Sequence, residues 1–291
     1  MHNLKHNFGN YTRSFIMSVI LVAVTVLAIV FSTVYRSGYF VSMFSRSEYY
    51  GSAMKAITTD IAEIENKLIV PVTGTKEVTR RTSVMAATLN WQNLANDING
   101  VVEEKYASAN SEYEIQTEAY KSKFLSAALE FAEKNKVKLG ASQKDQFKTA
   151  AEQATKVYCY YVRFPGIDDY AKKLEATRGR VGLSTIVLIA AFSVVCIIHF
   201  KKNKWKHRAV RFFIHSVSAA GLVLFAAPLA IFATKSTSAF TFSNNELFSS
   251  FISEYINGIL GYMIIIGLVF VVTAILLVAF VYSKMYKKIN E

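Results

Sequence analysis

The sequence predicts an all-α membrane protein, in which four transmembrane helices carry a helical-bundle extracytoplasmic domain inserted between the first and the second. Two observations predict this fold. Four windows of 20 or more residues are almost free of charge, although 19% of the 291 residues are charged. A long polar segment, residues 36–180, separates the first two windows. Charge segregated in this way excludes a soluble enzyme, a disordered chain and a coiled-coil rod.

Each apolar window is long enough to cross a bilayer core of about 30 Å as a helix, the conformation that satisfies the backbone in lipid. The predicted transmembrane helices are residues 15–35, 181–200, 210–234 and 259–282. The segments around them are a tail at 1–14, the extracytoplasmic domain at 36–180, a basic loop at 201–209, an outer loop at 235–258 and a tail at 283–291. The first window is longer than the apolar region of a typical signal peptide and no A-x-A site follows, which favours an uncleaved anchor.

Loop charges predict the orientation. The N-terminal tail, the segment 201–211 and the C-terminal tail have net charges of +2, +6 and +2, whereas the domain 36–180 has only +3. Because positive loops stay in the cytoplasm, both termini are predicted to be cytoplasmic and residues 36–180 to lie outside a cell membrane. The net charge of +12 therefore records topology, and we expect no nucleic-acid partner. Binding of the basic segment to anionic membrane lipids is an alternative use of these charges.

Helical periodicity dominates the inserted domain. Apolar residues recur at steps of three and four, which predicts four helices and near-antiparallel packing. The first helix would carry the seam from Met54 to Leu68, and the second would carry a seam from Val84 to Val101 that includes Trp91. The third is expected over about 110–136 and the fourth from Ser142, with Asp145 three residues on, to Pro165. Core packing explains the aromatic residues in these seams.

The second outer segment contains a short amphipathic helix. Ser243 and Glu246 match the S-x-x-E capping box, and Gly258 follows at a position typical of a helix end. Its apolar stripe consists of Leu247, Phe248, Phe251, Ile252 and Tyr255, together with Ile256. An isolated helix this short is marginal in water, so we expect this candidate interaction surface to be held by protein or lipid. Contact with the aromatic stretch 35–50 is the favoured alternative.

Candidates for chemistry are few. His215 is the best-placed intramembrane polar residue, about one turn inside the third window. Proton or ligand binding is one use of such a residue, and the favoured alternative is a hydrogen bond to a neighbouring helix or a place in the membrane interface. Nucleotide-binding, zinc-protease and serine-hydrolase motifs are missing, so we expect no enzyme, no catalytic residues, no cofactor and no metal. Cys159 is the one cysteine of the outer domain and Cys196 lies in the second window, which favours a disulfide-free bacterial surface protein.

Over residues 15–200, the order of span, helical insert and span is similar in architecture to bacterial chemoreceptors and sensor kinases. No residue motif carries the likeness, and two more spans follow in place of a signalling domain. The expected function is a non-catalytic integral membrane protein whose outer bundle is an interaction or sensing module within a membrane complex. Expected partners are membrane lipids and other membrane or surface proteins, or further copies of the chain. The alternative is a channel or transporter subunit that forms a pore by oligomerisation.

Overall fold

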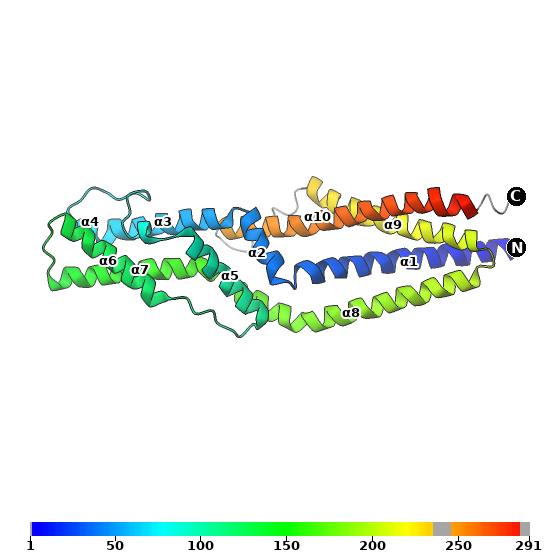
Figure 1. The fold of residues 1–291 in the computed structure, drawn as a ribbon, viewed down its shortest axis with the longest axis horizontal. Helices are drawn as coiled ribbons and strands as arrows, with labels where there is room; N and C mark the ends of the chain where they lie inside the picture. Colours follow the sequence, from blue (N-terminus) through cyan, green and yellow to red (C-terminus); the bar gives the residue numbers. More distant parts are fainter. Residues whose placement is uncertain (1, 235–245, 286–291) are drawn as a thin grey trace. The chain divides into compact units, whose positions relative to one another are not determined.

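The computed structural model describes residues 2–234 and 246–285 and is helical almost throughout, with no strand in these two ranges. Its helices, coloured along the sequence in Figure 1, have the following bounds. They are α1 (His2–Thr33), α2 (Ser37–Arg46), α3 (Tyr49–Leu68), α4 (Val70–Thr73), the 3-10 turn η1 (Ala86–Thr88), α5 (Trp91–Ala107), α6 (Thr117–Lys134), α7 (Ala141–Val162), α8 (Ile167–Lys202), α9 (Lys206–Ala233), α10 (Glu246–Leu276) and the π-helical turn η3 (Leu277–Tyr282).

The chain divides into two compact units. The apolar unit comprises Met1–Tyr39, Ala176–Phe242 and Ile252–Glu291, and the polar unit comprises Phe40–Glu175 and Ser243–Phe251. Four helical stretches are long and apolar enough to span a membrane. They are Phe8–Thr33 within α1, Ala141–Lys202 with α7 and α8, Lys206–Ala233, which is α9, and Glu246–Met285 with α10. The prediction of an all-helical chain with four such helices is therefore confirmed.

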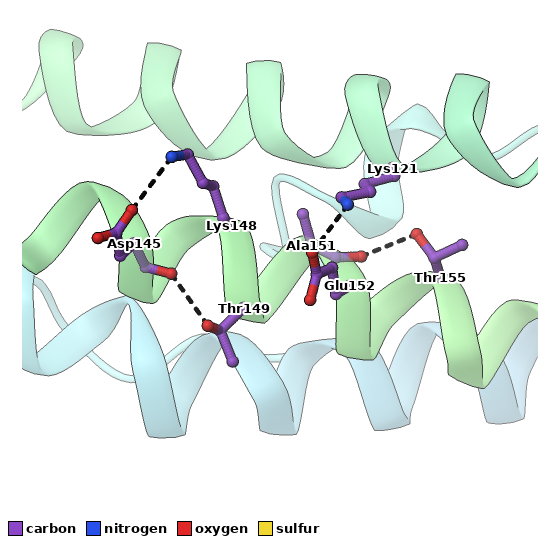
Figure 2. A network of polar contacts seen from close by, with 7 residues as sticks. All are labelled: Lys121, Asp145, Lys148, Thr149, Ala151, Glu152 and Thr155. Atoms are coloured by element: carbon purple, nitrogen blue, oxygen red, sulfur yellow. Dashed lines mark hydrogen bonds and ion pairs between the residues drawn. The ribbon is translucent and has the colours of Figure 1, made fainter.

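Helix α7 is the central element of the polar unit, because it packs against both α3 and α6 (Figure 1). Its buried face carries Phe147, Ala151, Ala154 and Tyr158 at helical spacing. The exposed side of the α6–α7 pair carries an ion pair between Lys121 and Glu152, with 2.8 Å between nitrogen and oxygen (Figure 2). Small residues on the buried face let the backbones approach, and the exposed ion pair adds little stability.

The second helix of the polar unit starts later than predicted. We expected it to include Val84, but α5 begins at Trp91, where the extended Asn90 accepts a hydrogen bond from the backbone N–H of Gln92. The preceding segment wraps instead around the buried carboxylate of Glu65 in α3. This carboxylate accepts hydrogen bonds from the Ser83 hydroxyl and the Met85 N–H, both at 2.7 Å. The seam prediction was thus wrong before residue 91, and Trp91 itself is 61% exposed.

Three tyrosines converge on one carboxylate in the same unit. The hydroxyls of Tyr113, Tyr120 and Tyr158 donate to Asp97 of α5 at 3.2, 2.9 and 2.7 Å. Burial, with Asp97 close by, raises the pKa of Tyr120 to about 12, so this phenol keeps the proton that it donates. The segment 108–116 holds Tyr113 against α5, where a Cβ on Gly100 would collide with its ring. Helix α6 therefore begins at Thr117, not near residue 110 as we expected.

Two other helix boundaries also differ from expectation. Helix α7 begins at Ala141, and the backbone N–H of Gly140 donates to the Gln143 side chain at 2.8 Å, so the Ser142–Asp145 pair is not its cap. Helix α10 runs through Gly258, because that glycine stays out of the left-handed conformation that ends helices. Ser243 of the predicted capping box lies outside the described residues.

Within the apolar unit, α1 packs along α9 through paired serines. Ser14 and Ser216 share a hydrogen bond of 2.9 Å between their hydroxyl oxygens, and each also bonds to the carbonyl of Phe212. Farther along, a Cβ on Gly221 of α9 would lie 2.8 Å from the carbonyl oxygen of Gly267 in α10. The two glycines therefore permit backbone contact between these helices, as expected for membrane helices that meet at small residues.

The buried carboxylate of Glu65 predicts a pH-dependent stability. Burial outweighs its hydrogen bonds and raises its pKa above the usual 4.5, so the folded protein binds this proton more tightly than the unfolded chain. Its contribution to the free energy of unfolding is therefore greatest below about pH 4.5 and falls as the pH rises through the folded pKa. We expect the melting temperature of the parent to fall relative to that of Glu65→Gln over this window. The exposed Glu63→Gln is the control, and equal slopes for all three proteins would contradict the prediction.

Candidate functional site

The predicted interaction stripe is divided between the two units. Leu247, half-buried, and the fully buried Phe248 and Phe251 belong to the polar unit. Ile252, half-buried, and the buried Tyr255 belong to the apolar unit, where the Tyr255 ring lies 5.5 Å from that of Tyr39. The same helix thus contributes apolar side chains to both units. The residues of the stripe are therefore packed against other parts of the protein and are not exposed.

Six aromatic residues of the polar unit form one cluster, here called the aromatic cluster. Its members are Phe40, Phe44, Tyr49, Phe164, Phe248 and Phe251, each no more than 4% exposed. Phe251 stacks on Phe44 with ring centroids 4.5 Å apart, and Phe248 meets Phe164 edge to face at 5.1 Å. Such ring pairs contribute about 0.5–1.5 kcal/mol beyond their apolar area. The first turns of α10 are thereby fixed to α2, α3 and the turn before α8.

That turn is conformationally strained. Phe164 has a φ of 42°, a left-handed conformation that costs a bulky side chain about 1–3 kcal/mol, and Gly166 has a φ of 87°. Phe164 is nevertheless 4% exposed, because its ring contacts Phe40, Phe44, Tyr49, Phe248 and Phe251. The aromatic contacts therefore hold the α7–α8 turn in a shape that its own backbone disfavours.

A groove lies beside this turn on the polar unit and is here called the turn groove. It has a volume of about 390 Å³ and is lined by Lys156, Cys159, Tyr160, Arg163, Phe164, Pro165, Gly166 and Asp168. Arg163 and Asp168 also line an adjoining cavity of about 60 Å³ that reaches Tyr113. Asp168 is neutralised by Lys105, with 2.7 Å between nitrogen and oxygen. The groove thus combines cationic side chains with apolar and aromatic walls.

The apolar helices α8 and α9 contain histidines, one of which is the candidate His215. His215 is exposed on the surface of α9, beside the ring of Phe212 at 6.3 Å. His199 of α8, in contrast, is fully buried, and its Nε2 lies 3.0 Å from the carbonyl oxygen of Ala209. The side-chain amide of Asn203 donates a hydrogen bond to the backbone carbonyl of His199 at 2.7 Å. No residue pattern identifies this contact, because the partner is a backbone carbonyl across the α8–α9 turn.

Within residues 2–234 and 246–285, no group of three or more His, Cys, Asp or Glu side chains could hold a metal ion. No protein-family model matches the chain, and no curated protein or solved structure matches it either. The arrangement of the site therefore has to be interpreted from its own geometry. That geometry comprises the aromatic cluster, the strained turn and the turn groove, all three of which include Phe164.

The aromatic cluster predicts a large stability effect at the start of α10. Replacing Phe248 and Phe251 with serine removes two buried rings, each worth about 3–5 kcal/mol in other proteins. We expect the melting temperature of the purified full chain in mild detergent to fall by about 10 °C or more. Leu268→Ser, on the exposed side of the same helix, is the control and should melt close to the parent. A double variant that melts with the control would show that the cluster does not hold α10.

Proposed function

We propose that the chain is a non-catalytic multi-pass protein of the cell membrane. Its polar unit faces the extracytoplasmic side and acts as an interaction or sensing module within a membrane complex. The observation that carries this proposal is the burial of Phe248 and Phe251 in the polar unit, at the start of a helix whose later residues are apolar enough for a membrane. A change in the aromatic cluster would therefore act directly on α10.

Two further features support an assembly role. The indole of Trp91 is 61% exposed on the polar unit, and exposed tryptophan is typical of residues that dominate protein interfaces. In the apolar unit, residues 181–198 of α8 include no buried residue. This stretch of α8 is therefore free to contact lipid or the helix of another membrane subunit.

The proposed orientation predicts which positions are accessible from outside the cell. Single cysteines are placed at Lys138, in the polar unit, or at Lys204, between α8 and α9, with Cys159 and Cys196 changed to serine. Both lysines are exposed, whereas the neighbouring Asn203 is 5% exposed and would resist labelling for reasons unrelated to topology. An impermeant maleimide added to intact cells should label position 138 and should reach position 204 only after permeabilisation. The opposite pattern would reverse the proposed orientation.

The interaction role predicts a specific partner at Trp91. A photo-crosslinking amino acid at this position, in cells expressing the full chain, should give one dominant adduct with another membrane or surface protein. The same amino acid at the exposed Glu133 should give none. Trp91→Ala should reduce co-purification of that protein in mild detergent at least about tenfold, because interface tryptophans often contribute 2 kcal/mol or more. Absence of a specific adduct would argue against the interaction module.

The alternative is a pore formed by several copies of the chain. It predicts that the crosslinked partner is a second copy and that the purified oligomer conducts ions in liposomes. In the apolar unit, the buried Ser14 and Ser216 bond to each other and to backbone carbonyls, which leaves them no role in lining a pore. This contact favours the interaction module.

A further inference from the structure

We propose that the turn groove binds a small organic carboxylate, that is, a molecule with one carboxylate and a compact apolar or aromatic body. The inference rests on the proposed sensing role of the polar unit and names the class of ligand that this unit would sense. It is carried by the charge, the walls and the position of the groove.

The charged side chains of the groove favour an anionic ligand. Within the described ranges neither Arg163 nor Lys156 forms an ion pair, whereas Asp168 is already paired with Lys105. Both cations line the groove. Lys156 also interacts electrostatically with Glu152, one helical turn away, so the positive charge of the groove is centred on Arg163. A guanidinium offers a planar pair of N–H donors that matches a carboxylate, and such charge-assisted bonds are stronger than neutral ones. Arg163 is therefore the expected anchor for the ligand.

The apolar side chains that line the groove favour a ligand with an apolar body. Tyr160 is 49% exposed and the half-buried Pro165 adds apolar surface to the same groove, whereas Phe164 is 4% exposed and adds almost none. Its volume of about 390 Å³ lies in the range of about 300–1,000 Å³ that is common for small-molecule sites. A flat apolar body could lie against these walls while its carboxylate meets Arg163. This combination of walls and charge favours an organic anion over an inorganic one.

The position of the groove gives binding a consequence. Phe164 contributes to the groove and also lies 5.1 Å, ring to ring, from both Phe248 and Phe251. Because Phe164 occupies a strained backbone conformation, a ligand that binds this shape of the turn more tightly than a relaxed one stabilises the strained shape. The ligand would thus bias the contacts that hold the first turns of α10.

The test uses Cys159 as a reporter, since this thiol lines the groove. The full chain with Cys196→Ser is purified in mild detergent and treated with methyl methanethiosulfonate, a neutral reagent. Burial raises the pKa of the Cys159 thiol, so the reaction is followed at alkaline pH. Benzoate is the probe, and benzyl alcohol and benzylamine are its neutral and cationic analogues. We expect saturating benzoate to slow the modification of Cys159 at least about threefold and the two analogues to have no effect.

Matched variants locate the anion site. The rate of Cys159 modification is measured with and without benzoate in each variant. Arg163→Gln should lower the affinity for benzoate about tenfold, and Lys156→Gln should lower it less. Lys144→Gln removes an exposed charge from the same helix outside the groove and should retain full protection. Line broadening of 4-fluorobenzoate in fluorine NMR gives the affinity without relying on the thiol. Equal protection by benzyl alcohol, unchanged binding in Arg163→Gln, or no benzoate binding by NMR would each overturn the proposal.

The two proposals fail separately. Crosslinking at Trp91 tests the partner and does not involve the turn groove, because Trp91 is not among the groove residues. If benzoate does not bind but the adduct at Trp91 forms, the ligand proposal is wrong and the proposed interaction role stands. If benzoate binds but no adduct forms at Trp91, the ligand proposal is supported and the proposed partner at Trp91 is contradicted.

Discussion

The stacking of Phe251 on Phe44 connects the start of the last long helix to the opposite end of the sequence. Without that contact, the first turns of α10 would expose two phenylalanines, and Phe164 would lose the packing that compensates for its left-handed backbone. Phe164 also belongs to the turn groove, so the shape of the groove would change with that of the turn. The geometry of the candidate site therefore depends on hydrophobic burial among aromatic rings.

Polar contacts in the polar unit have a different role from the aromatic ones. Glu65 binds a backbone segment that has little regular structure, and Asp97 receives the hydroxyls of three tyrosines. Donors surround each carboxylate, although those of Glu65 do not outweigh the cost of its burial, and Asp97 is only half-buried. These contacts determine the paths of the segments before α5 and α6, which have little regular structure.

Much of the fold could be predicted from the sequence because it depends on local patterns. Apolar windows predicted the four helices long enough for a membrane, and the spacing of Phe248 and Phe251 predicted a helix with one apolar side. The segments before α5 and α6 could not be predicted, since contacts with Glu65 and Gly100, distant in sequence, determine their path. The turn groove was missed for a similar reason. Its shape depends on the φ of Phe164, which packing alone enforces in a non-glycine residue.

The close approach of Gly221 and Gly267 in the apolar unit limits how α9 and α10 can move against each other. Backbone atoms that meet at one point leave no room for one helix to slide past the other, because a neighbouring side chain would have to pass through the contact. Farther along, α9 also packs on η3, which continues α10, and Ile214 and Val217 of α9 form an apolar cluster with Ala274 of α10. The glycine pair and this apolar cluster therefore fix the register of the two helices at two separate places.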